Sequence, residues 1–260
     1  MFTQAHTTSP VCSPARTSLL TGLHAPAHGC LENGMGRDPD LDTLVDPLHQ
    51  QGYHTIMAGK QHFGPCPEFD VVIDPSSEEL LQLATRREYA ADRSYDDAVV
   101  VEQCQQAMAA AATRSEPFFA FCSLEAPHVP LHPPTRCMAQ VADMLLPDLN
   151  LSPDEPSGLT ESHQDLLGLL GPEQKFEGLE PADPAYWVEA VGRRYDAAHA
   201  PAIDAWRRCY YAYAVYADEM LGRLLAFLDA QNLAENTLVI FTSDHGQQYF
   251  DHGFNDKHCW

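Results

Sequence analysis

The chain has 260 residues, and 45% of them are hydrophobic, which is enough to fill the core of one large domain or two small ones. Its 37 acidic residues outnumber its 15 basic residues and give a formal net charge of -22. This charge argues against nucleic acid or an anionic membrane surface as the main partner. An anionic substrate therefore needs a local cluster of cations in a pocket, where short distances outweigh the screened field of distant carboxylates.

Eight cysteines are scattered along the chain without a Cys-x-x-Cys pair or a zinc-like spacing. In an exported protein a few of them could form disulfides, and otherwise they fit small buried hydrophobic residues. The N-terminal stretch MFTQAHTTSP lacks the basic and apolar regions of a signal peptide, and no apolar run approaches the length of a membrane span. We therefore expect a soluble chain with no targeting segment, and its compartment stays open.

The first half of the chain alternates predicted helices and strands. SPARTSLLTGL, with Ser13 as the cap, a proline in the first turn and Gly22 at the end, predicts a short helix. A helix that stops near Gly52 precedes a predicted strand at 54–58 and a loop bounded by glycine. A helix over 97–113 leads into PFFAFCSL, which fits a buried strand, and then into the proline-stiffened loop EAPHVPLHPP.

The second half begins with an acidic, proline-rich stretch at about 130–200, which predicts an excursion from the core with few site residues. Apolar and aromatic positions three to four apart then predict one long amphipathic helix over 204–230. NTLVIFTSDHG predicts a turn, a buried strand and a polar loop. The recurring order of helix, strand and polar loop predicts an α/β fold with a mostly parallel sheet.

Candidate site residues follow the predicted strands, where ligands of open α/β sheets gather. The three clusters are Lys60 with His62, then His128, then Asp244 with His245.

Cys12 and Arg16 join these clusters from the first predicted helix. Arg16 lies one turn after Cys12, so its guanidinium can point back toward Cys12 and a bound oxyanion. Considered alone, each residue has a simpler interpretation, because Cys12 fits a buried helix start and the others fit solvated loops or caps. Residues 251–253 repeat the Asp-His-Gly tripeptide and fit either a second ligand set or an exposed loop.

Four motifs occur in the order found in the type I sulfatases. CSPARTSLLTG resembles the Cys-x-Pro-x-Arg signature of that family, and GYHTIMAGKQHFG resembles its second signature. PFFAFCSLEAPHVP is similar to the family's strand ending in Pro-His, and VIFTSDHGQQYFDHGFNDK is similar to its metal-binding loop with a lysine further on. The resemblance implies an alkaline-phosphatase-like α/β fold, with a parallel or mixed sheet flanked by helices, in which residues 1–260 are a partial catalytic domain.

The resemblance also implies a covalent modification at Cys12. A formylglycine-generating enzyme would oxidise Cys12 to formylglycine, and the hydrated aldehyde would attack the sulfur of a sulfate ester. Arg16 would stabilise formylglycine and the metal-bound oxygen, and the helix N-terminus at Cys12 would help to hold the sulfate anion.

The remaining roles also come from the resemblance. Lys60, His128 and Lys257 would bind the sulfate group, and His62 would orient or deprotonate the nucleophile. His128 could also protonate the leaving oxygen, and the division of acid and base roles stays open.

The resemblance implies a calcium ion held by Asp244, His245 and the group derived from Cys12. Only eleven residues precede Cys12, so we expect the family's opening strand and its two acidic ligands to be absent. Because the sequence stops at Trp260, we also expect the family's C-terminal subdomain to be absent, and Gln61 stands where the family often has a tryptophan. We expect a fragment of a longer sulfatase; if the chain is complete, we expect weak metal binding and little turnover.

The predicted function is arylsulfatase-like hydrolysis of a sulfate ester in a sulfated small molecule or glycan. One alternative is a phosphonate or phosphate ester hydrolase of the same superfamily, and another is a truncated, non-catalytic remnant. Members of the family are commonly secreted, periplasmic or lysosomal, and the sequence does not choose between these compartments.

Overall fold

The computed structural model describes residues 3–74, 95–129, 131, 133–151, 200–253, 255 and 257. The chain divides into two compact units. The first unit contains Met1–Ala126 and Ala217–His245, and the second contains Pro127–Tyr216 and Gly246–Trp260. Among the helices in the described ranges, none is both long enough and apolar enough to cross a bilayer.

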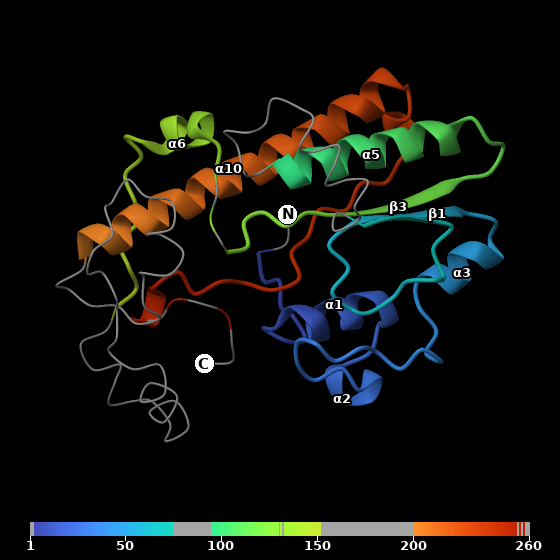
Figure 1. Ribbon diagram of the computed structural model, residues 1–260, viewed down its shortest axis with the longest axis horizontal. Coiled ribbons are helices and arrows are strands. Elements are labelled where there is room, and N and C mark those ends of the chain that lie inside the picture. Colours follow the sequence, from blue (N-terminus) through green and yellow to red (C-terminus); the bar gives the residue numbers. More distant parts are fainter. Residues whose placement is uncertain are drawn as a thin grey trace. The chain divides into compact units, whose positions relative to one another are not determined.

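Helices and strands alternate in the first unit, as expected for an α/β fold (Figure 1). The elements in chain order are α1 (Cys12–Thr21), α2 (Ala25–His28), α3 (Val45–Gln50), β1 (His54–Gly59), β2 (Val71–Ile73), α5 (Tyr95–Ala112), β3 (Phe118–Ser123), α6 (Thr135–Val141), α10 (Ala200–Ala230), and the short 3₁₀ helices η2 (Ala234–Asn236) and η3 (Asp251–Gly253).

The described sheet has three parallel strands in the order β2-β1-β3. β1 is the central strand: Ile56 pairs with Val71 of β2 on one side and with Ala120 of β3 on the other. The carboxyl ends of β1 and β3 coincide, because Gly59 is opposite Ser123. The predicted strands at 54–58 and 117–124 are therefore confirmed, although β3 is half-buried along most of its length.

Side chains of β1 alternate between two apolar clusters, because successive residues of a strand face opposite sides of the sheet. Ile56 and Ala58 pack with Val100 and Cys104 of α5. Met57 belongs to the other cluster, whose remaining buried residues are Leu20, Val45, Phe63, Cys66 and Phe69. Figure 1 shows α5 above the strands and α1 with α3 below them, so helices cover both faces of β1.

The first helix begins at Cys12, two residues earlier than a cap at Ser13 implies. Its N-cap is Val11, which makes no side-chain capping bond, so the prediction that Ser13 caps the helix is wrong. Ser13 lies inside α1, and its backbone N–H donates to Asn33 Oδ1 at 2.9 Å. A distant amide oxygen therefore satisfies one of the N–H groups that a helix start leaves unpaired.

The prediction of a buried strand at 238–242 is also wrong. These residues form no strand in the described structure, and the side chains of Leu238, Ile240 and Phe241 are 86%, 77% and 70% exposed. Apolar composition favours an extended, buried segment, but a strand also needs a hydrogen-bonded partner. No described strand pairs with this segment.

The long helix predicted over 204–230 is confirmed as α10, which begins at Ala200. Within the second unit, the indole ring of Trp206 contacts Tyr210, Tyr249 and Phe250, and it is 2% exposed. Residues 152–199, which hold most of the predicted acidic excursion, lie outside the described residues.

Gly59 is the residue whose replacement we expect to damage the fold most directly. Its φ is 93°, and a Cβ atom there would lie 2.0 Å from the backbone oxygen of Ser123. Gly52 has a φ of 77°, but a Cβ atom there would meet no atom within 4 Å. Gly59→Ala should lower the free energy of unfolding by about 3–5 kcal/mol, against about 1–2 kcal/mol for Gly52→Ala. Urea denaturation of both variants tests this, and equal losses would contradict it.

Candidate active site

The guanidinium of Arg16 lies at the centre of the candidate site in the first unit. α1 places Arg16 one turn after Cys12, and its side chain is 10% exposed. Nε donates to Asp244 Oδ2 at 2.8 Å, and Nη1 donates to Ser123 Oγ at 2.7 Å and to the Lys60 carbonyl at 2.9 Å. One side chain therefore connects α1 with the ends of β1 and β3 and with the loop at 244.

The surroundings of Asp244 favour the ionised form of its carboxyl. Burial acts to raise the pKa of its carboxyl, but the positive charge of Arg16, with smaller contributions from His245, outweighs burial and leaves the pKa below its usual value. Its second oxygen, Oδ1, accepts the backbone N–H of His245 at 3.0 Å. The Asp244 carboxylate is thus held on both of its oxygens.

Cys12 and His245 lie beside this pair. The Cys12 side chain is buried, and its Sγ is 3.1 Å from His245 Nε2. Cys12, Asp244 and His245 each offer one ligand atom, and these atoms lie within 4.8 Å of one another. Among the described residues, this is the only group of three His, Cys, Asp or Glu side chains close enough to hold a metal ion.

The donor set of this group fits calcium poorly. Calcium takes six to eight oxygen ligands, whereas the group offers one carboxylate, one imidazole and one thiol. Both carboxylate oxygens of Asp244 already accept hydrogen bonds. Sulfur and nitrogen donors are more typical of zinc, so these three residues do not by themselves form a calcium site.

Lys60 follows Gly59 at the end of β1, and its ammonium pairs with an acidic residue. Nζ lies 3.0 Å from Glu125 Oε1, and the side chains of Lys60 and Glu125 are 14% and 45% exposed. The Lys60 backbone N–H donates to the Ser123 carbonyl at 3.0 Å. Lys60 is therefore held by its backbone at the coinciding ends of β1 and β3.

The structure does not bring His62 into this group. Its side chain is exposed, its backbone has a φ of 62°, and within the described ranges it makes no hydrogen bond. Its role as the residue that orients the nucleophile stays a prediction.

His128 and Lys257 lie in the second unit and contact each other. Lys257 Nζ is 3.0 Å from His128 Nε2, and His128 Nδ1 is hydrogen-bonded to the Val129 carbonyl. These contacts fit a neutral imidazole that donates from Nδ1 and accepts at Nε2. Two residues predicted to bind the same sulfate group, 129 positions apart in the chain, are thus adjacent.

The second Asp-His-Gly tripeptide forms a turn that is fastened to Asn150. Asp251 Oδ1 accepts the Asn150 N–H at 2.8 Å, and the His252 N–H donates to the Asn150 carbonyl at 2.8 Å. Neither side chain belongs to a three-residue metal-ligand group within the described part of the chain. The structure therefore favours a surface turn over a second ligand set at residues 251–253.

Sequence reasoning missed four residues that organise the site of the first unit: Asn33, Asp97, Ser123 and Glu125. Ser123 lies near the end of the predicted strand 117–124 and Glu125 directly follows that strand, so their position at the ligand-binding edge could have identified them. Asn33 accepts a hydrogen bond from the backbone of Ser13, and Asp97 accepts one from the backbone of Glu125. These partners are distant in sequence, so no local pattern indicates them.

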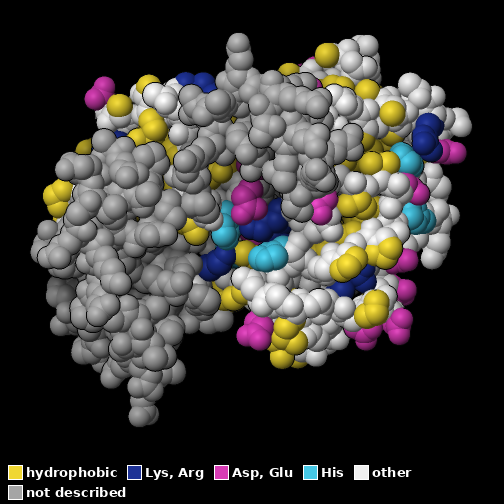
Figure 2. Space-filling model, viewed as in Figure 1, with side chains coloured by type: hydrophobic (Ala, Val, Ile, Leu, Met, Phe, Trp, Pro, Cys, Tyr) yellow, Lys and Arg dark blue, Asp and Glu magenta, His cyan; other side chains and the backbone are white. Residues whose placement is uncertain are grey.

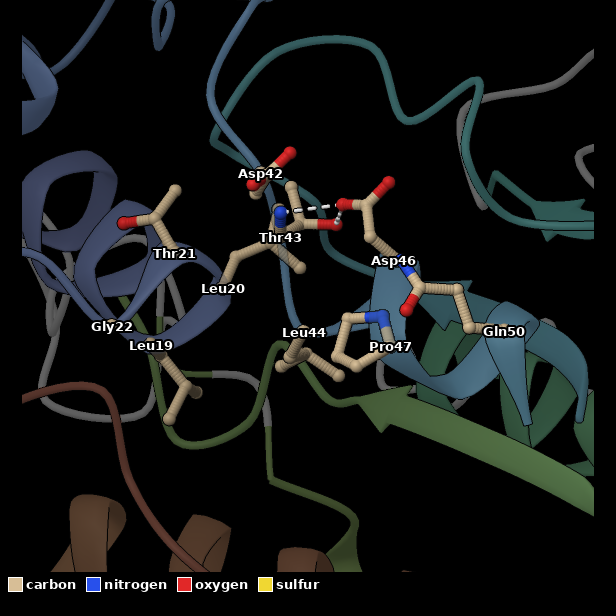
Figure 3. Close-up of a pocket in the computed structure, with 10 residues that line it drawn as sticks. All are labelled: Leu19, Leu20, Thr21, Gly22, Asp42, Thr43, Leu44, Asp46, Pro47 and Gln50. Carbon is tan, nitrogen blue, oxygen red and sulfur yellow. Dashed lines mark hydrogen bonds between the residues drawn. The ribbon is translucent and has the colours of Figure 1, made fainter.

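The described surface includes a cavity that lies outside the group formed by Arg16, Cys12, Asp244 and His245. The face seen in Figure 2 carries both acidic and basic side chains, with basic and histidine side chains beside acidic ones near its centre. A cavity of about 480 Å³ lies between the end of α1 and residues 42–50 (Figure 3). There, Asp46 Oδ2 accepts bonds from both the N–H and the hydroxyl of Thr43, and no residue of the Arg16 cluster lines the cavity.

Comparison with known proteins agrees with the motifs. The sequence profile of the family described as Sulfatase matches residues 1–258. The chain is 25% identical to an uncharacterised sulfatase, YidJ, of Escherichia coli, over 98% of this chain and 52% of the relative. It is also 25% identical to an N-acetylglucosamine-6-O-sulfatase of Bacteroides thetaiotaomicron, over 98% of this chain and 53% of the relative. The chain thus spans about half the length of these curated relatives.

The fold is shared with a solved enzyme of Agrobacterium radiobacter. Its phosphonate monoester hydrolase superposes with a TM-score of 0.75 at 19% identity, over 98% of this chain and 57% of that one. This likeness confirms the expected alkaline-phosphatase-like fold. The match of the family profile to nearly every residue, together with the four motifs in order, shows that the chain belongs to the sulfatase family.

Proposed function

We propose that this chain carries catalytic residues of a sulfuric ester hydrolase. The observation that carries the proposal is the Arg16 guanidinium, which joins the Cys12 helix to Asp244 and to the ends of β1 and β3. This one side chain links its own motif to the other three motifs of the sulfatase pattern. A purely structural arginine would not require a cysteine one turn earlier and a histidine against its sulfur.

Cys12 is the proposed nucleophile precursor, through oxidation to formylglycine. When present, formylglycine supplies the hydroxyl of a hydrated aldehyde for attack on the sulfur of the ester. The position of Cys12 fits, because it is the first residue of α1 and because His245 Nε2 lies 3.1 Å from its side chain. The helix start favours a bound anion, and Arg16 is held by three acceptors in a fixed orientation nearby.

Lys60, His128 and Lys257 are the proposed sulfate-binding residues. Lys60 is an ammonium held on rigid backbone, as an anion site in an acidic protein requires. An imidazole can act as a base at Nε2 when neutral and as an acid once Nε2 is protonated, so both acid and base roles remain open for His128. His62 stays the proposed orienting residue.

We propose calcium as the metal ion of this site. Asp244 and His245 would contribute ligands if the ion binds, but the described residues provide one carboxylate for it. The substrate proposed is a sulfated small molecule or glycan, because one relative is an N-acetylglucosamine-6-O-sulfatase. The likeness to a phosphonate monoester hydrolase, at 19% identity, supports a shared fold and leaves phosphonate esters as the second candidate substrate.

Substrate class is tested with paired aryl esters. The chain, produced together with a formylglycine-generating enzyme, is assayed on 4-nitrophenyl sulfate and on the matched phenylphosphonate ester. We expect kcat/KM to favour the sulfate by about tenfold or more, and Cys12→Ala to abolish turnover of both esters, because the nucleophile is lost. A preference for the phosphonate would select the second candidate.

The modification of Cys12 is tested by mass spectrometry. Because the Cys12 side chain is 1% exposed, we expect conversion during synthesis and none when the purified, folded chain is incubated with the same maturation enzyme. The peptide with Cys12 should carry an aldehyde in place of the thiol, whereas the peptide with Cys30, an equally buried cysteine outside the motif, should keep its thiol. An unmodified Cys12 after co-expression would support the non-catalytic remnant.

Calcium affinity is tested by calorimetric titration of the purified chain. With one carboxylate in the candidate ligand group, we expect a dissociation constant weaker than about 10⁻⁴ M. Asp244→Asn should weaken the remaining binding further, while Asp46→Asn, which alters a carboxylate outside the group, should not. Tight uptake of one ion per chain would show that other residues complete the shell.

A further inference from the structure

Glu125 is an acidic residue in contact with a cation of the proposed sulfate site. Its Oε1 lies 3.0 Å from Lys60 Nζ, and none of the roles described above uses it. A carboxylate and a sulfate group are both oxyanions that bind an ammonium through charge-assisted hydrogen bonds. We propose that Glu125 is a specificity-determining residue that competes with the substrate's sulfate group for Lys60. This inference rests on the proposed role of Lys60.

The two partners differ in their freedom to move. The Lys60 side chain is 14% exposed, and its backbone is fixed on both sides by the Ser123 carbonyl and by Arg16. Glu125 is 45% exposed, so its carboxylate can be hydrated when it leaves the ammonium. An incoming anion therefore displaces Glu125, and Lys60 stays where it is.

Asp97 confines this displacement to the side chain of Glu125. Asp97 lies in the first turn of α5, is 3% exposed, and accepts two adjacent backbone N–H groups. Its Oδ1 is 2.7 Å from the Glu125 nitrogen, and its Oδ2 is 2.8 Å from the Ala126 nitrogen. Because these two hydrogen bonds hold the backbone after β3, the Glu125 side chain can release Lys60 by changing its rotamer, without movement of the loop.

The competition filters ligands by charge. The Glu125 carboxylate is partly exposed and gains hydration when it leaves the ammonium, so a ligand that brings a full negative charge displaces it. A neutral ligand makes no compensating contact and leaves the pair intact. Glu125 thus lowers the affinity for every anion by a modest factor and keeps the ammonium neutralised when no anion is bound.

The test measures binding of inorganic sulfate to the full chain by calorimetry, with sodium chloride holding the ionic strength constant. Glu125→Gln should lower the dissociation constant for sulfate by about fivefold. Glu125→Asp, which keeps the charge but withdraws the carboxylate from Lys60, should also tighten binding. Glu235→Gln removes the same charge from an exposed position in η2 and should leave the constant unchanged.

Lys60→Met separates this inference from the proposed function. Lys60→Met should weaken sulfate binding, and in the Lys60→Met background Glu125→Gln should no longer tighten it. If Lys60→Met weakens binding but neither Glu125 variant tightens it, the competition is disproved and the role of Lys60 stands. If Lys60→Met leaves sulfate binding unchanged, both the role of Lys60 and the competition are disproved.

Discussion

The buried Arg16 guanidinium is the interaction on which the rest of the candidate site depends. It satisfies a carboxylate, a hydroxyl and a backbone carbonyl from three distant parts of the chain. A lysine could not reach all three acceptors at once, because its donors diverge from a single atom. Removing the guanidinium would leave the Asp244 carboxylate largely buried without its main counter-charge, which is among the most destabilising changes a protein can suffer.

The parallel pairing of β1 and β3 determines where this interaction occurs. Gly59 and Ser123 end their strands at the same level, so Lys60 and Glu125 emerge side by side. The close approach of the two backbones is possible only because Gly59 lacks a side chain. The register between β1 and β3 therefore fixes the positions of the site residues that follow these strands.

Ion pairs neutralise the positive charges of Arg16 and Lys60 in the first unit. In a chain with a net charge of -22, Arg16 and Lys60 of the first unit are both paired with carboxylates, Arg16 with Asp244 and Lys60 with Glu125. The two pairs differ in exposure, and this difference separates their functions. The Arg16 pair is mostly buried and serves as a scaffold, while the carboxylate of the Lys60 pair is partly hydrated and exchangeable.

The sequence by itself determined the elements whose signals are local. The periodicity of α10, the apolar run of β1 and the family motifs around Cys12 all depend on near neighbours, and they placed the elements and the sulfatase family correctly. Only the tertiary structure decided that Asn33 accepts the Ser13 N–H in the first turn of α1, that Asp97 holds the backbone after β3, and that residues 238–242 are exposed. Each of these outcomes depends on a partner many residues away, or on the lack of one in the described chain, and hydrogen-bond partners of that kind leave no mark on local composition.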